Sequence, residues 1–313
     1  MIIKPVIKGL LTYVPGMMKI LPKGSGGSTK SAAYCYGVWL KHITLLWENG
    51  MHSIPNTLAE LGPGDSIGIG LAAMLSGVDN YYSLDVVRFA NTNLNLKIFD
   101  ELVTLFRHRT ARPTKGWPDF DCYLDENLFP SHILTEEVLA KSLAEDRVAR
   151  IRTALADPEA HQKEITIKYM VPWSSEKIIE KESVDVILSH SVFEHVIDIT
   201  NTYSALAQWL KPSGMMSHQI DFDAHGLSKE WNGYRAYSEL LWKLMVGRRP
   251  YLINREPCSA HVECILKNHF KIVCLLKSHR TDGIDRSQLS SYWKKISDDD
   301  LTCSGIFVQV QKQ

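Results

Sequence analysis

The segment from Thr57 to Leu75 constrains this chain most, because it predicts a strand, a glycine-rich turn and a helix in immediate succession. The short apolar run from Thr57 to Leu61 leads into Gly62 to Gly64. Glycines let a backbone approach a ligand closely, and the unpaired N–H groups at a helix N-terminus can donate hydrogen bonds to that ligand. Apolar residues from Ile67 onward recur at helical spacing. The segment therefore predicts a nucleotide-binding turn, with a glycine-rich surface turn as the alternative.

A second strand is predicted from Tyr81 to Asp85, whose composition and length are typical of β structure. Asp85 lies nineteen residues after Ser66. In mononucleotide-binding α/β halves, the carboxylate at the tip of the second strand holds the ribose, because it can accept hydrogen bonds from two neighbouring hydroxyls. Strand, turn, helix and spaced acid together predict nucleotide binding. An ordinary strand-capping aspartate is the alternative.

Composition limits the class of protein and its partners. With 313 residues and 45% hydrophobic content, the chain can form one α/β domain with insertions. Lys+Arg and Asp+Glu both number 35, so no net charge points to a nucleic-acid partner. The six scattered cysteines favour a reducing compartment, and we expect the cytoplasm. Since no run of about 20 apolar residues occurs, no stable membrane span is expected.

A metal site is not predicted. Cys258, His261 and Cys264 recur every three residues and could be imagined as ligands. They do not form the usual paired cysteine motif, and on a helix the two cysteines would point about 120° apart.

Residues 1–56 form a predicted N-terminal helical segment that could cover a ligand as a lid. Its first part has a helical apolar stripe interrupted by Pro5 and Pro15. We expect this stripe to pack on the main domain, and contact with a membrane surface or a partner is the alternative. A glycine- and serine-rich linker at 23–31 precedes an aromatic helix. Tyr36 on that helix is a candidate cofactor contact, and a core aromatic is the alternative.

Residues 57–313 form the predicted main domain, with insertions at about 86–164 and 221–269 that could supply substrate specificity. The polar residues Ser189 to Ser191 end the fourth strand, so we expect them at the same sheet edge as Gly62 to Ser66. Helices are expected at Ile98–Phe106 and Glu136–Ala154, and a further helix is expected to end at Lys211–Gly214. Further strands are expected at Ile165–Tyr169, Ser183–Ser189 and Met215–Ile220.

The stretch from Leu58 to Phe222 resembles the class I S-adenosylmethionine-dependent methyltransferases. Four motifs in order carry the resemblance: Glu60–Ser66, Asp85, Ser189–Val196 and Leu210–Gly214. It implies an α/β fold with a Rossmann-like, doubly wound, seven-stranded and mostly parallel sheet carrying helical insertions. It also implies S-adenosylmethionine as the cofactor and two further strands that close the sheet, for which Phe270–Leu276 and Gly305–Val310 are the candidates.

The resemblance assigns the methionine end of the cofactor to the glycine turn, the ribose to Asp85 and the substrate-facing side to the end of the fourth strand. Two departures concern Ser66, which replaces a third glycine, and Lys168–Val171, where the family often has an acid beside the adenine. Adenine contacts would then rest on backbone or stacking. Together with Tyr36 from the aromatic helix, the candidate cofactor contacts are Glu60, Gly62, Pro63, Gly64, Asp65, Ser66, Asp85, Val86, Met170, Val171, Ser189, His190 and Ser191.

The expected activity is methylation of a small or medium-sized molecule, at oxygen. Because the methyl donor is already activated, the protein chiefly aligns the acceptor, and a hydroxyl acceptor benefits from a base. His195, His218 and Asp221 are the candidate bases, with a structural role as the alternative for each. A nicotinamide-dependent (NAD(P)) oxidoreductase and a non-catalytic S-adenosylmethionine-binding protein are the alternative functions.

Overall fold

The computed structural model describes residues 3–17, 27–113, 123–124, 128–157, 164–173, 176–249 and 252–313. Its contacts define two compact units. Unit 1 contains Met1–Gly24, Ser191–Ser204 and His218–Val308, and unit 2 contains Ser25–His190, Ala205–Ser217 and Gln309–Gln313. The separation of residues 1–56 from 57–313 stays a prediction, and part of the expected linker at 23–31 lies outside the described residues.

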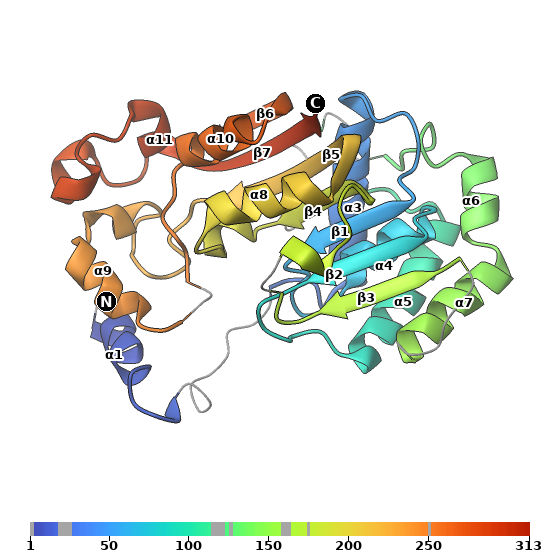
Figure 1. Cartoon of the computed structure of the whole chain (residues 1–313), viewed down its shortest axis with the longest axis horizontal. Helices are drawn as coiled ribbons and strands as arrows, with labels where there is room; N and C mark the ends of the chain where they lie inside the picture. The colour runs from blue at the N-terminus through green and yellow to red at the C-terminus, as the bar shows by residue number, and fades with distance from the viewer. Residues whose placement is uncertain are drawn as a thin grey trace. The chain divides into compact units, whose positions relative to one another are not determined.

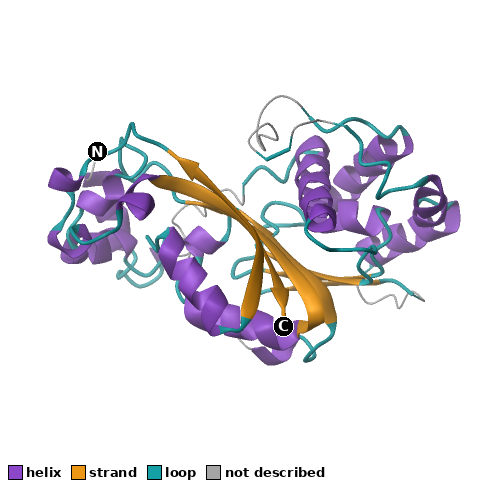
Figure 2. Ribbon diagram, turned by 90° about the horizontal axis from the view of Figure 1, so that it is seen from above, coloured by secondary structure: helices purple, strands orange, loops and turns teal. Residues whose placement is uncertain are grey.

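Seven strands form one sheet in the order β3-β2-β1-β4-β5-β7-β6, seen in orange in Figure 2. Strand β1 is parallel to β2 and β4, and β2 is parallel to β3. The order of the first five strands is that of the doubly wound nucleotide-binding fold. The predicted fold class is therefore confirmed. The strands are β1 Thr57–Leu61, β2 Asn80–Leu84, β3 Thr166–Met170, β4 Val184–His190, β5 Leu210–Asp221, β6 Phe270–His279 and β7 Cys303–Lys312.

The helices of unit 2 pack beside its parallel strands (Figure 1). All five residues of β1 are buried, as expected for a parallel strand covered on both faces. The predicted helix at 136–154 is interrupted, because Ala144 has an extended ψ of 139°. The helices are α3 Ala32–Glu48, α4 Gly68–Leu75, α5 Thr92–Arg107, α6 Glu136–Ser142 and α7 Glu145–Ala156.

The predicted turn at Lys211–Gly214 is corrected by the structure, because helix α8, Ile199–Trp209, passes directly into β5. Lys312 Nζ donates to the carbonyl oxygens of Ala207 (2.8 Å) and Leu210 (2.7 Å), which the helix end would otherwise leave without a partner. A Cβ on Gly214 would lie 2.8 Å from Leu210 Cγ. Close packing therefore requires this glycine.

Unit 1 has its own hydrophobic core. Its helices include α1 Ile3–Leu11, α9 Glu239–Val246, α10 Cys258–Lys267 and α11 Asp298–Thr302. Tyr234, Tyr237 and Trp242 pack together in this core. The second insertion, which could supply substrate specificity, thus contributes these three aromatic residues to the core of unit 1.

Helix α1 packs closely on α9, since a Cβ on Gly9 would lie 1.9 Å from the Leu244 carbonyl oxygen. Ile3, Ile7 and Leu10 remain exposed on α1, and contact with a membrane surface or partner stays a prediction. Within the described ranges, every helix is too short or too polar to cross a bilayer.

Candidate functional site

The carboxyl ends of four parallel strands meet at one edge of unit 2. The register aligns Leu61 with Leu84 and Ser189, and aligns Leu84 with Met170. The residues that follow these positions therefore lie in one row across the sheet. In spatial order they are Val171, Asp85, Gly62 and His190.

The turn after β1 depends on its glycines. Gly62 has φ 61° and Gly64 has φ 77°, in the left-handed region that glycine adopts without a steric penalty. The Gly62 N–H donates to the carbonyl oxygen of Leu84 at 2.8 Å. This bond joins the turn, including Pro63, to the end of β2.

Asp85 lies beside this turn. Its Oδ1 accepts hydrogen bonds from the N–H groups of Val86 (2.7 Å) and Val87 (3.3 Å). Burial raises the pKa of Asp85, and these backbone hydrogen bonds oppose the rise. The Gly62 bond to Leu84 places Asp85 next to the glycine turn, and contact of these residues with a cofactor stays a prediction. Val86 is 47% exposed next to it.

The third-glycine position, Ser66, is hydrogen-bonded within unit 2. Its N–H donates to Thr29 Oγ1 at 3.0 Å, and its hydroxyl donates to the Thr29 carbonyl oxygen. The next amide, of Ile67, donates to Asn95 Oδ1 at 3.2 Å. Thr29 and Asn95, which the sequence did not single out, thus hold the start of α4. Asp65 pairs with Lys30 at 3.6 Å.

Two further candidate cofactor residues use their polar groups inside the protein. Glu60 Oε2 accepts hydrogen bonds from the Gly70 N–H at 3.2 Å and from the Tyr81 hydroxyl, and burial raises the pKa of Glu60 to about 7. The Tyr36 hydroxyl donates to the Thr110 carbonyl oxygen, and its ring is buried. This placement favours the core alternative for Tyr36.

Helix α3 brings buried basic residues to the end of β4. His190 Nδ1 lies 3.2 Å from His42 Nε2, and His42 Nδ1 lies 2.7 Å from Ser217 Oγ. Lys41 is fully buried, with Nζ 4.5 Å from the centre of the Tyr123 ring. Burial lowers the pKa of His190, and the charges of Lys41 and His42 lower it further. The sequence placed these residues on a helix without indicating that they face His190.

The three candidate bases lie in unit 1. His218 is fully buried, and burial, with a smaller effect of His261, lowers its pKa to about 3. This placement favours a structural role for His218. The Asp221 side chain is 31% exposed, with Oδ2 3.4 Å from His225 Nε2. The His195 and His225 ring centres are 5.1 Å apart. The structure thus groups His195 and Asp221 around His225, which was not a candidate base.

Ser191 also lies in unit 1, with φ 56° and its N–H donating to the Gln219 carbonyl oxygen at 2.9 Å. Two hollows of unit 2 lie away from the glycine turn. One, of about 480 Å³, lies at the amino ends of β1 and β4, and its lining includes Asn56 and Asp185. Another, of about 270 Å³, is lined in part by Thr44 and Arg112. None of the four residues at the carboxyl ends of the strands, Val171, Asp85, Gly62 and His190, lines either hollow.

Comparison with known proteins gives one family model, described as a methyltransferase domain, which matches residues 131–217. This region contains β3, β4, α8 and the first part of β5. The match favours a methyltransferase over a nicotinamide-dependent oxidoreductase. No curated protein sequence matches the chain.

Several solved structures resemble the chain at low identity. An S-adenosylmethionine-dependent methyltransferase from Mesorhizobium loti is 12% identical, with 87% of this chain and 98% of that chain covered and a TM-score of 0.42. One from Methanosarcina mazei is 11% identical, with 85% and 96% covered and a TM-score of 0.44. Phosphoethanolamine N-methyltransferase 2 from Haemonchus contortus, in complex with S-adenosyl-L-methionine, is 14% identical, with 90% and 56% covered and a TM-score of 0.42.

Proposed function

We propose that the chain is a class I S-adenosylmethionine-dependent methyltransferase that methylates an oxygen atom of a small or medium-sized acceptor. The match of residues 131–217 to a methyltransferase domain supports this proposal. We propose that the cofactor binds at the carboxyl ends of β1 to β4. The observation that carries this proposal is the 2.8 Å hydrogen bond from the Gly62 N–H to the carbonyl oxygen of Leu84, the residue before Asp85. It holds the glycine turn next to a carboxylate that can only accept hydrogen bonds.

The residues of this edge fit an adenosine-containing cofactor. The backbone at Gly62 and Gly64 carries no side chain that would keep a ligand away. Asp85 can accept hydrogen bonds from both ribose hydroxyls. The exposed side chain of Val86 offers an apolar surface next to Asp85, and Met170 and Val171 end the neighbouring strand. Apolar side chains at these positions suit a flat base held by packing and backbone contacts.

When bound, the cofactor supplies a methyl group on a sulfonium, which an acceptor atom attacks in line. A hydroxyl acceptor must lose its proton, and we propose Asp221 as the base that takes it. Its side chain is partly exposed at the end of β5, and its Oδ1 is fixed by the Asp223 N–H at 2.8 Å. A partly exposed carboxylate can contact an acceptor, whereas the fully buried His218 cannot.

We further propose a small-molecule acceptor, no nucleic-acid partner and a cytoplasmic location. Equal numbers of acidic and basic residues give no net field to attract a polyanion. Within the part of the chain that the structure describes, Cys35, Cys258, Cys264 and Cys303 form no disulfide. Reduced cysteines are typical of the cytosol.

The test is transfer of radiolabelled methyl groups from S-adenosylmethionine to matched hydroxyl and amine acceptors. We expect labelled product with hydroxyl acceptors only. Asp221→Asn should lower kcat by about 100-fold or more, because general-base catalysis contributes at least that factor, and should leave cofactor affinity unchanged. Asp223→Asn is the matched control, because Asp223 instead pairs with Arg280 at 3.2 Å.

Transfer to amines alone, or full activity of Asp221→Asn, would contradict the oxygen-directed mechanism. Cofactor binding without turnover across the whole panel would favour the non-catalytic alternative.

A further inference from the structure

Glu194 is a buried acidic residue of unit 1 that makes no side-chain hydrogen bond with another side chain among the described residues. It lies in the short helix η2, Phe193–His195, and is 2% exposed. Among the described residues, neither Oε1 nor Oε2 has a hydrogen-bond partner. Burying an ionised carboxylate without a partner costs several kcal/mol, so such a group normally pairs, takes up a proton or binds a metal ion. Burial, together with the charge of Asp221, raises the pKa of Glu194 to about 8.

Two imidazoles lie next to this carboxylate. One potential ligand atom from each of Glu194, His195 and His225 lies within 4.8 Å of the other two. The two imidazole rings are nearly perpendicular, at 81°. Three ligand atoms about 2.1 Å from one tetrahedral ion are separated by about 3.4 Å, so a small closure of the side chains would bring all three onto an ion.

The backbone around Glu194 and His195 is held firmly by Asn254. The Asn254 N–H donates to the Glu194 carbonyl oxygen at 2.6 Å, and Nδ2 donates to the carbonyl oxygens of Phe193 and Val196, both at 2.7 Å. These three bonds fix η2 from a residue about sixty positions away in the sequence. The two η2 ligands are therefore positioned by the fold before any ion arrives.

His225 lies in a tight turn. It has φ 47°, which non-glycine residues rarely adopt, and the Leu227 N–H donates to the Ala224 carbonyl oxygen at 2.9 Å. Asp221 contacts the His225 ring, as carboxylates commonly do beside metal-binding imidazoles. His195 and His225 are both partly accessible, so an ion can reach the buried carboxylate from solvent.

We propose that Glu194, His195 and His225 bind one divalent first-row transition-metal ion, with Asp221 positioning the His225 ring. Two imidazoles and a carboxylate suit Zn²⁺ or Mn²⁺ better than Mg²⁺ or Ca²⁺, which prefer oxygen ligands throughout. This site goes beyond the proposed methyl transfer and does not depend on it. Binding there leaves Asp221 in place as the candidate base.

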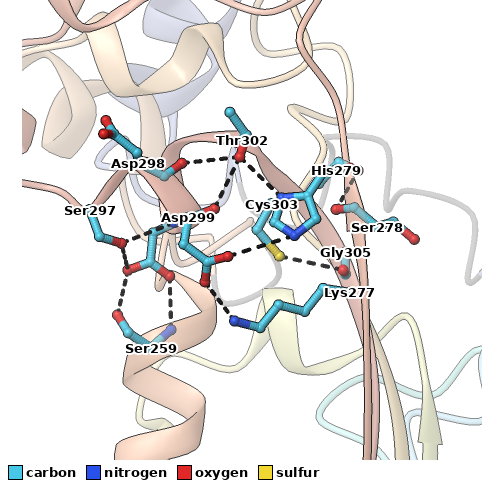
Figure 3. Close-up of polar contacts among 12 residues, drawn as sticks. Ser259, Lys277, Ser278, His279, Ser297, Asp298, Asp299, Thr302, Cys303 and Gly305 are labelled. Carbon is cyan, nitrogen blue, oxygen red and sulfur yellow. Dashed lines mark hydrogen bonds and ion pairs between the residues drawn. The ribbon is translucent and has the colours of Figure 1, made fainter.

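The test is titration of tag-free, chelator-treated protein with Zn²⁺ by calorimetry, and with Co²⁺ by visible absorption, which reports nitrogen ligands. We expect one equivalent bound, and at least tenfold weaker binding in Glu194→Gln and in His225→Gln. His279→Gln is the matched control, because this exposed histidine of unit 1 also lies beside a carboxylate, with Nε2 3.6 Å from Asp299 Oδ1 (Figure 3). It should bind metal like the wild type.

Circular dichroism checks that each variant is folded, and His225→Gln, on an accessible turn, decides the outcome if Glu194→Gln does not fold. The proposal is overturned if the wild type binds no ion, or if His225→Gln and any folded Glu194→Gln bind it as tightly as His279→Gln does. Because the readout is metal binding alone, its failure is separate from a failure of methyl transfer.

Discussion

Asp300 and Glu194 are both buried carboxylates of unit 1, and they differ in what meets their oxygens. Asp300 is 5% exposed and accepts hydrogen bonds from the Ser259 N–H (3.0 Å), the Ser259 hydroxyl (2.7 Å) and the Ser297 hydroxyl (3.0 Å). Glu194 is at least as buried and accepts no hydrogen bond from the described residues. Asp300 thus ties α10 to α11, whereas the oxygens of Glu194 are the ones that the proposed metal ion would use.

The largest expected effect tests this difference through stability. Asp300→Ala should lower the free energy of unfolding by about 3 to 5 kcal/mol, because it leaves three donors without an acceptor at a cost of about 1 to 3 kcal/mol each when buried. Glu194→Gln should cost less than about 1 kcal/mol in metal-free protein near pH 7, because the raised pKa leaves Glu194 protonated and glutamine is also neutral and of similar size. Urea denaturation measures both. If Asp300→Ala and Glu194→Gln lowered the free energy of unfolding equally, the proposed difference between the two buried carboxyl groups would be wrong.

A smaller effect concerns the histidines in the same unit. Burial lowers the pKa values of His218 and His261 to about 3, so in the folded protein they stay neutral while the unfolded chain takes up protons below about 6.5. Stability is then lost as the pH falls, by about 2 kcal/mol for the pair between pH 6.5 and 5.5. His218→Gln should halve this loss in urea titrations. A His218→Gln variant that loses as much stability as the wild type over this interval would contradict it.

The smallest effect is expected at the exposed cluster in Figure 3, where Asp299 lies between Lys277 and His279. His279→Gln should change the free energy of unfolding by less than about 0.5 kcal/mol, because an exposed ion pair contributes little. Thermal melting measures this. If His279→Gln lowered the free energy of unfolding as much as Asp300→Ala does, exposed and buried carboxylates would stabilise unit 1 equally, which contradicts this prediction.

The sequence predicted the strands and the edge at which they end. Glycines at 62 and 64 are needed for their backbone conformation, and Asp85 follows a recognisable strand, so local chemistry was sufficient for both. The parallel pairing of β1 with β2 then brings the glycine turn and Asp85 together, because its register aligns Leu61 with Leu84. Boundaries were less accurate, as the continuation of α8 into β5 shows.

The cluster of Glu194, His195 and His225, the proposed metal site, could not be predicted in the same way. Glu194 and His225 lie thirty-one positions apart, on a short helix and a turn that have no periodic pattern. Their proximity depends on tertiary bonds such as those of Asn254. The burial of Lys41 and His42 on α3 was missed for a related reason, since the helical period does not reveal that both sides of a helix are covered.

The central claim is that the edge formed by the glycine turn and Asp85 binds the cofactor, and calorimetric titration with S-adenosylhomocysteine tests it most directly. Asp85→Asn should weaken binding at least tenfold, because hydrogen bonds to a charged group contribute about 1.5 to 3 kcal/mol each. Asp79→Asn, which instead removes an ion pair with Arg147 at the amino end of β2, should bind like the wild type. Equal affinity of Asp85→Asn and wild type, or no binding by the wild type, would contradict the claim.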